Sequence, residues 1–247
     1  MNDELTLHRL LSALPFYVTP PYPCSYLDDR QASTVFVDPA FPLSMEQYSQ
    51  LANLGFRRSG DQVYRPECAN CTLCIPVRIP VNAFRPNRSQ QRCWRRNEDL
   101  RINVVDAVFR EEHFKLYRRY MSSRHAGGDM DKDDPEAYQS LITARWCDSE
   151  LIEFRLQQEL LAVAVVDQFE RGLSAVYTFF DPELGKRSLG VYAVLTEIRM
   201  IQEAGQDWLY LGYWNPQSPK MAYKNNYAPL EFFDQQGWTR VEKIALS

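Results

Sequence analysis

The chain has 247 residues, of which 45% are hydrophobic and 24% are charged, and its net charge is −4. This length accommodates one large domain or two small ones, and the composition excludes a disordered chain. The apolar run at 160–166 is too short to span a bilayer, and residues 1–18 lack the long apolar stretch of a signal peptide. We therefore expect a cytoplasmic protein with reduced cysteines.

The first hundred residues are irregular and rich in proline. Residues 44–54 predict a helix, because apolar side chains recur along one stripe and Gly55 follows them. Residues 55–66 predict a hairpin with a Ser-Gly-Asp turn, and residues 77–81 alternate like a strand.

An arginine-rich stretch, FRPNRSQQRCWRRNEDLR, occupies residues 84–101. We expect Ser89 to cap a helix here, which places Arg92, Arg95 and Arg96 on one helical face. Because the whole chain is acidic, a nucleic-acid partner needs such a local basic face. The alternative is an ordinary solvated face with Trp94 packed inward.

The second half is more regular. Helices are predicted at 109–125 and 134–144, then strands at 150–157, 159–170 and 172–182, a helix at 188–205, a strand at 207–214, a short helix at 220–224 and a strand at 229–233. This order predicts an α/β (α+β) fold with a GNAT-like acyltransferase core, in which the acyl donor enters a notch between splayed strands. We expect an N-terminal cysteine-containing domain at 1–103 and a GNAT-like transferase domain at 104–247.

A CoA-dependent member of that fold class needs a glycine-rich turn that cradles the pyrophosphate at a helix start. Gly185 and Gly190 have the wrong spacing for this turn, although Lys186 and Arg187 can still hold a phosphate of another kind. A CoA-dependent N-acetyltransferase is therefore a disfavoured alternative. A non-enzymatic zinc module that binds RNA is another, but it leaves the GNAT-ordered half without a role.

Four stretches carry a resemblance to a known family: PCSYL at 23–27, YRPECANCTLCIPVRIPV at 64–81, SLGVYAVLTEI at 188–198 and LGYWNPQSPKMAYKNNYAPLEFF at 211–233. In this order and spacing, they resemble the aminoacyl-tRNA–protein transferase family. The resemblance implies transfer of an amino acid from charged tRNA to a protein with an acidic first residue, which marks that protein for degradation. The bacterial-type cysteine spacing favours leucine as the donor amino acid, with arginine as the alternative.

The implied reaction is aminolysis of an ester. It requires alignment of an amine, a proton acceptor and stabilisation of an oxyanion, and it needs no thiol or serine nucleophile. Tyr213 and Tyr223 are candidate oxyanion donors, Lys220 a candidate for stabilising the oxyanion or a phosphate, and His125 a candidate proton acceptor. For the tyrosines, the alternative is a core residue with a satisfied hydroxyl. The expected tRNA-binding residues are Arg92, Arg95, Arg96, Lys186, Arg187 and Lys224.

Selection of an acidic N-terminus calls for a fixed cation, and a guanidinium fits a carboxylate with two parallel hydrogen bonds. Arg78, next to the cysteine loop, is the candidate acceptor-binding residue. Its alternative role is a buried structural ion pair.

Cys68, Cys71 and Cys74 follow one another at three-residue intervals, and Cys24 can supply a fourth thiolate. Four thiolates suit zinc or an iron–sulfur cluster. The resemblance implies a cluster in related eukaryotic arginyltransferases, but this chain lacks their adjacent paired cysteines. The alternative is a loop of reduced, buried cysteines. No cofactor is required for the chemistry, and the oligomeric state is left open.

Overall fold

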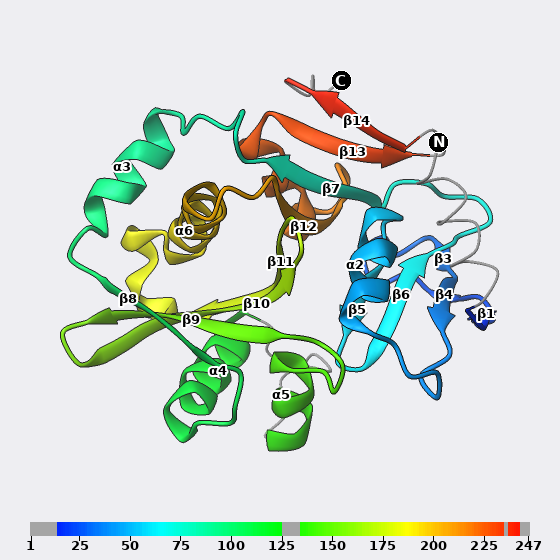
Figure 1. The fold of residues 1–247 in the computed structure, drawn as a ribbon, viewed down its shortest axis with the longest axis horizontal. Helices are drawn as coiled ribbons and strands as arrows, with labels where there is room; N and C mark the ends of the chain where they lie inside the picture. Colours follow the sequence, from blue (N-terminus) through cyan, green and yellow to red (C-terminus); the bar gives the residue numbers. More distant parts are fainter. Residues whose placement is uncertain (1–13, 125–133, 235–236, 243–247) are drawn as a thin grey trace. The chain divides into compact units, whose positions relative to one another are not determined.

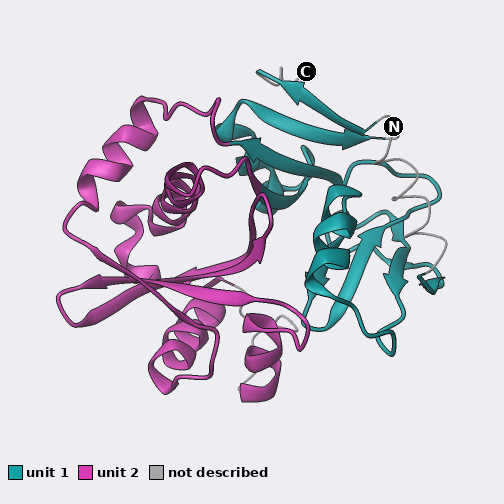
Figure 2. Ribbon diagram, viewed as in Figure 1, with its two compact units in different colours: residues 1–80, 210–247 teal, residues 81–209 magenta. Residues whose placement is uncertain are grey.

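The computed structural model describes residues 14–124, 134–234 and 237–242 (Figure 1). The chain forms two compact units: residues 1–80 with 210–247, and residues 81–209 (Figure 2). The expected boundary at 103/104 falls inside strand β8 (Arg101–Asp106) of the second unit. The structure divides the chain differently because the C-terminal strands return to the N-terminal segment, where β13 (Leu230–Asp234) pairs with β7 (Ile75–Pro80).

The first unit contains a small antiparallel sheet in the order β1-β4-β6-β5, formed by Phe16–Val18, Thr34–Val37, Gln62–Pro66 and Arg57–Ser59. A short ribbon pairs β2 (Tyr22–Pro23) with β3 (Gln31–Ala32). Helix α2 (Met45–Asn53) begins at a capping box, in which Ser44 and Gln47 bond to each other's backbone amides, and it buries Tyr48, Leu51 and Ala52. The predicted helix at 44–54 and the hairpin at 55–66 are confirmed.

The same unit holds a second group of strands. Strand β13 lies between β7 and β14 (Gly237–Val241), and β12 (Trp208–Trp214) continues into this unit from the other. Between β12 and β13 come helix α7 (Pro219–Ala222) and the 3-10 helix η2 (Tyr223–Tyr227). The sequence did not predict β14.

The second unit is built on four antiparallel strands in the order β11-β10-β9-β8. Three of them are β9 (Ser149–Leu156), β10 (Glu159–Phe169) and β11 (Gly172–Phe180), which confirm the predicted run of three strands. Residues of β10 alternate between two cores: Val163 and Val165 pack with helices α4 (Glu111–Arg124) and α5 (Pro135–Ile142), while Ala162 and Ala164 pack with α6 (Leu189–Glu203). Figure 1 shows these helices on opposite faces of the sheet. A strand covered on both sides explains the continuous apolar run in the sequence.

Helix α3 (Arg88–Arg96) begins two residues earlier than a Ser89 cap allows. Asn87 is the N-cap: its side chain accepts from the Gln90 amide, and the Gln90 side chain accepts from the Asn87 amide. The prediction of Ser89 was therefore wrong, because asparagine caps as well as serine and Gln90 completes the capping box. Strand β8, which follows α3, was also not predicted. Within the described residues, no helix is both long and apolar enough to cross a membrane.

Candidate functional site

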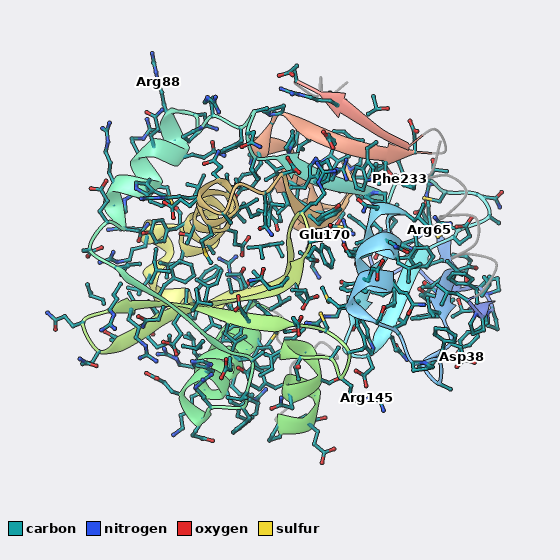
Figure 3. The ribbon with its side chains drawn as sticks, in the orientation of Figure 1. Asp38, Arg65, Arg88, Arg145, Glu170 and Phe233 are labelled. Carbon is teal, nitrogen blue, oxygen red and sulfur yellow. The ribbon has the colours of Figure 1, made fainter. Side chains whose placement is uncertain are left out.

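A basic surface lies on helix α3 in the second unit. Arg92, Arg95 and Arg96 are exposed, and Arg88 at the start of the helix points outward (Figure 3). The opposite edge of the helix is fixed, since the buried Asn97 side chain donates to the Arg187 carbonyl at 2.8 Å. The three arginines therefore share a solvated face, as the sequence predicted.

The 3-10 helix η1 (Pro182–Arg187) adjoins this face. The Arg96 guanidinium donates to the Lys186 carbonyl, which brings the exposed Lys186 beside α3. Arg187 is engaged differently, because its guanidinium binds both carboxylate oxygens of Asp99 at 2.9 and 2.8 Å. The hydrogen bond from Arg187 lowers the pKa of Asp99. Lys186 thus extends the basic face, whereas Arg187 braces η1 against α3.

A space beside Gly212 is the second candidate site, and it lies in the first unit. Gly212 adopts a positive φ of +77° within β12, a conformation that other residues rarely take. A methyl group added there would lie 3.6 Å from the Lys224 Nζ and 4.0 Å from the Arg57 Nε. Two cationic side chains therefore border the space that the glycine leaves open.

Lys224 is largely buried on η2, and its amine donates to the Tyr213 carbonyl at 2.5 Å. The pKa of this amine is lowered to about 7, mainly by burial and also by the nearby Arg57, while Cys74 acts in the opposite direction. In one continuous α-helix, Lys220 and Lys224 would share a face because they are four residues apart, but α7 ends at Ala222 and a 3-10 helix follows. Lys220 is consequently exposed, while Lys224 turns inward. Lys224 is therefore not placed like a surface residue that binds a tRNA phosphate.

Arg57 is 5% exposed on β5 and was not singled out by the sequence. Its Nη1 donates to the Phe56 carbonyl at 2.6 Å and the Ala52 carbonyl at 3.4 Å. Its guanidinium also lies 5.3 Å from the ring centre of Tyr210. The Nε and Nη2 atoms are buried and have no hydrogen-bond partner among the described residues. The only sequence signal was an arginine in a short hairpin strand, which does not distinguish it from Arg58.

The catalytic candidates occupy different surroundings. The Tyr213 hydroxyl donates to the carbonyls of Gly55 and Tyr64 at 2.9 and 3.1 Å, and burial raises its pKa well above the usual value. These contacts match the alternative of a satisfied core tyrosine. Tyr223 is 47% exposed and Lys220 is exposed, so both are accessible to a substrate. His125 lies outside the described residues.

Arg78 forms a buried ion pair rather than an open cationic site. Its Nε lies 2.6 Å from the Glu231 Oε2, and its Nη1 donates to the Asn53 Oδ1 at 3.0 Å. The guanidinium also stacks 4.2 Å from the centre of the Trp238 ring. These contacts match the structural alternative for Arg78.

The four cysteines proposed as ligands lie close enough to influence one another. The pKa of the Cys74 thiol is raised to about 11, mainly by burial; a hydrogen bond from Asn215 opposes this rise, and the charges of Cys24, Cys68 and Cys71 add to it. All four are free thiols, and as thiolates they are ligands of the type that binds zinc. In the described part of the chain, however, no three His, Cys, Asp or Glu side chains are arranged as a group that could hold a metal.

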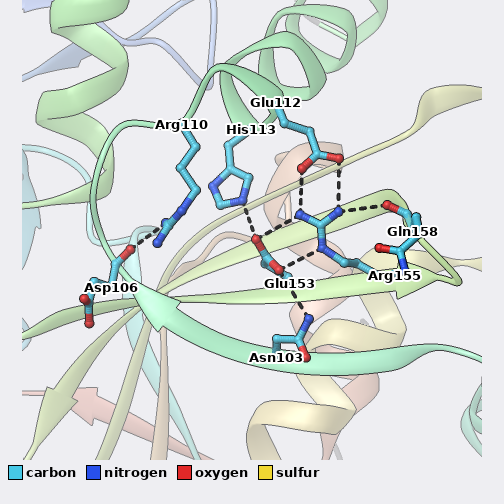
Figure 4. A network of polar contacts seen from close by, with 8 residues as sticks. All are labelled: Asn103, Asp106, Arg110, Glu112, His113, Glu153, Arg155 and Gln158. Atoms are coloured by element: carbon cyan, nitrogen blue, oxygen red, sulfur yellow. Dashed lines mark hydrogen bonds and ion pairs between the residues drawn. The ribbon is translucent and has the colours of Figure 1, made fainter.

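A further polar network, centred on the buried His113 and Glu153, lies in the second unit (Figure 4). The His113 Nε2 lies 2.7 Å from the Glu153 Oε1, and Arg155 bridges Glu153 and Glu112 at 2.9 and 2.7 Å. Burial lowers the pKa of His113, so the neutral imidazole donates to the carboxylate. This network joins α4 to β9 and is structural.

Comparison with known proteins places the chain in a family. The model for the N terminus of arginine-tRNA-protein transferases matches residues 22–92, and the model for their C terminus matches residues 112–234. The chain belongs to this family. The matches include β7, the first part of α3 and the segment that carries Gly212 and Lys224.

Curated relatives extend the similarity over most of the chain. An aspartate/glutamate leucyltransferase of Saccharophagus degradans is 49% identical over 92% of this chain and 97% of its own length. Proteins with the same name from Hahella chejuensis and Nitrosococcus oceani are 47% and 50% identical, over 94% and 91% of this chain and 99% and 94% of their own. A solved structure of L-PGS from Bacillus licheniformis is 12% identical with a TM-score of 0.44, covering 87% of this chain and 78% of that one. At that level, the structural similarity transfers no function.

Proposed function

We propose that this protein transfers leucine from leucyl-tRNA to the N-terminal Asp or Glu of acceptor proteins, tagging them for degradation. The observation that carries this proposal is the 47–50% identity, over 91–94% of the chain, to relatives named aspartate/glutamate leucyltransferase. Because charged tRNA is its donor, the protein acts in the cytoplasm.

The reaction is aminolysis of the ester that joins leucine to the terminal ribose. The α-amine nitrogen of the acceptor forms a bond to the leucyl carbonyl carbon, and the bond from that carbon to the ribose oxygen breaks. The ribose oxygen leaves as a hydroxyl, carrying a proton equivalent to the one that the amine loses. The ester is already activated, so the protein contributes mainly alignment and stabilisation of the oxyanion.

The tRNA is held by the basic face formed by Arg92, Arg95, Arg96 and Lys186. The helical acceptor arm of a tRNA presents phosphates and 2′-hydroxyls across a shallow groove, which a cationic surface can follow without reading the sequence. A cavity of about 440 Å³ adjoins this face, and Trp94, Arg95 and Arg199 are among its lining residues. Its mixture of rings and cations suits contact with an exposed base and its phosphate.

The oxyanion is stabilised by Tyr223 and Lys220, the two catalytic candidates with accessible side chains. Tyr213 acts as a positioning residue. Its hydroxyl donates a hydrogen bond to the Gly55 carbonyl, and its backbone carbonyl accepts one from the Lys224 amine. Neither role involves a covalent intermediate on the protein.

Arginine is the second candidate donor, because the matching family models are described as those of arginine-tRNA-protein transferases. Incubation with leucyl-tRNA or arginyl-tRNA and peptides beginning with Asp, Glu, Lys or Ala distinguishes the two. We expect the Asp and Glu peptides to gain the mass of one leucyl residue. A gain of an arginyl residue, or acetylation from acetyl-CoA only, would overturn the proposal.

We propose separately that the four cysteines have a structural role; they are Cys24, Cys68, Cys71 and Cys74. They would hold zinc or an iron–sulfur cluster with four thiolates, and the bound group would tie the cysteine loop to the β2–β3 segment. Metal and sulfide analysis of protein purified without oxygen tests this, alongside the unfolding temperature of Cys68→Ser. Metal-free protein with an unchanged unfolding temperature in the variant would contradict it.

A further inference from the structure

One edge of the Arg57 guanidinium is unpartnered among the described residues, and the Nε of that edge borders the space beside Gly212. Its Nη1 is occupied by two backbone carbonyls, which fixes the plane of the group. The remaining edge, Nε with Nη2, is buried and unpartnered within the described residues. These two nitrogens form the fork that binds both oxygens of a carboxylate in parallel hydrogen bonds.

Lys224 supplies a second cation at the same place. The position of a Cβ on Gly212 is 3.6 Å from the Lys224 Nζ and 4.0 Å from the Arg57 Nε, so one small anion in that space would lie near both. Gly212 itself is only partly buried, although the two Arg57 nitrogens without a described partner are fully buried. The amine uses one of its three donors on the Tyr213 carbonyl.

The charges around this space are unbalanced. Arg57 forms no ion pair with a described acidic side chain, and the groups that shift the Lys224 amine include no carboxylate. A buried guanidinium beside a largely buried amine, with no described counterion, is unfavourable in an isolated protein, because each charged group loses hydration without gaining a partner, and the amine is only partly protonated near pH 7. Binding an anion would supply the missing partner to both.

We propose that Arg57 and Lys224 bind the side-chain carboxylate of the acceptor's N-terminal Asp or Glu in the space left by Gly212. This inference rests on the proposed function and names the part of the protein that reads the acidic residue. It replaces Arg78, whose guanidinium is already occupied by Glu231.

A carboxylate fits this site better than a tRNA phosphate. The fork offers two coplanar donors, which match the two coplanar oxygens of a carboxylate, and a buried space suits a short side chain at the end of a peptide. The phosphates of the tRNA backbone follow one another along a long chain, and the exposed cations of α3 are available to bind them. We expect the site to disfavour Asn and Gln, since their amide groups would present hydrogens to fixed donors.

The test compares peptides that differ only in their first residue, Asp, Asn, Glu or Gln, with saturating leucyl-tRNA. For Arg57→Gln, we expect kcat/KM for the Asp peptide to fall about ten- to hundredfold through KM, the range of a lost hydrogen bond to a charged group. Transfer to the Asn peptide and binding of leucyl-tRNA should not change. Arg57→Lys keeps the charge without the fork and should give an intermediate loss.

Arg65→Gln is the matched control, because Arg65 lies on the neighbouring strand β6 and pairs with Glu67 at the surface. Lys224→Gln and Gly212→Ala test the same space if the Arg57 variants do not fold, and each should also lower the preference for Asp over Asn. Unchanged preference in folded Arg57 and Lys224 variants would overturn the inference. Lost tRNA binding with unchanged preference would instead assign the site to a phosphate. Wild-type protein that transfers to no peptide would reject the proposed function itself.

Discussion

Arg78 of β7 and Glu231 of β13 lie directly opposite each other in the antiparallel register, with the Arg78 Nε 2.6 Å from the Glu231 Oε2. The two residues are 153 positions apart in the chain. Their side chains are 8% and 16% exposed. The pair therefore fastens the returning C-terminal strand to the N-terminal segment, in a setting where each charge depends on the other.

Replacing Arg78 should lower the stability of the fold and leave the preference for an N-terminal Asp over Asn unchanged. Arg78→Ala leaves Glu231 buried without a counterion, which costs about 3–5 kcal/mol of unfolding free energy. Chemical denaturation measures this loss, and Arg78→Met combined with Glu231→Leu should recover much of it. A stable Arg78→Ala protein that no longer prefers Asp over Asn would return the acceptor role to Arg78.

Neutralising the basic face of α3 should weaken tRNA binding. With Arg92, Arg95 and Arg96 all changed to Gln, we expect a lower affinity and a flatter dependence on salt, because each lost phosphate contact reduces the log–log slope by about 0.7–0.9. A filter-binding titration at several salt concentrations measures both. The control changes Lys115, Arg171 and Arg240, each of which already pairs with an acidic side chain. If both triple variants bind alike, the effect is one of net charge and the face has no special role.

Apart from β8 and the short helix η1, the sequence predicted the order of elements in the second unit, because their periodicities are strong. The apolar run of β10 and the stripe on α6 each reflect burial that is local to one element. The apolar stripe of residues 44–54 and the helix start expected at 134 were equally local, and the structure confirms both helices.

The candidate site at Gly212 was less predictable for a physical reason. Lys220 and Lys224 share a face only if one α-helix contains both, and the change to a 3-10 helix after Ala222 separates them. Arg57 and Arg78 look alike in the sequence, since both are arginines in short strands. Only the folded chain shows that Glu231 occupies Arg78 and that the described residues leave one edge of Arg57 open.

The network around Glu153 should make the protein sensitive to acid. Hydrogen bonds from Arg155, and then from His113 and Asn103, lower the pKa of Glu153 to about 2, from 4.5. A lowered carboxyl pKa contributes stability that is present above pH 4.5 and is lost as the pH falls towards 2, amounting to about 3 kcal/mol. Urea midpoints between pH 5 and 3 should therefore fall in the wild type and change less in Glu153→Gln. Glu112→Gln is the control, since Glu112 touches the same Arg155 from a side chain that is 52% exposed.

Glu197 of α6 should give the opposite dependence at higher pH. Its side chain is fully buried, both carboxylate oxygens have no hydrogen-bond partner among the described residues, and burial raises its pKa to about 8 from 4.5. The folded state therefore holds a proton that the unfolded state releases between pH 4.5 and 8, and stability falls as the pH rises through that window. Glu197→Gln cannot ionise at this position. Its unfolding free energy relative to that of the wild type should therefore rise by about 1.4 kcal/mol for each pH unit between 5 and 8. The exposed Glu203→Gln on the same helix should follow the wild type. Parallel pH profiles for Glu197→Gln and the wild type would mean that this carboxyl has a partner in solution.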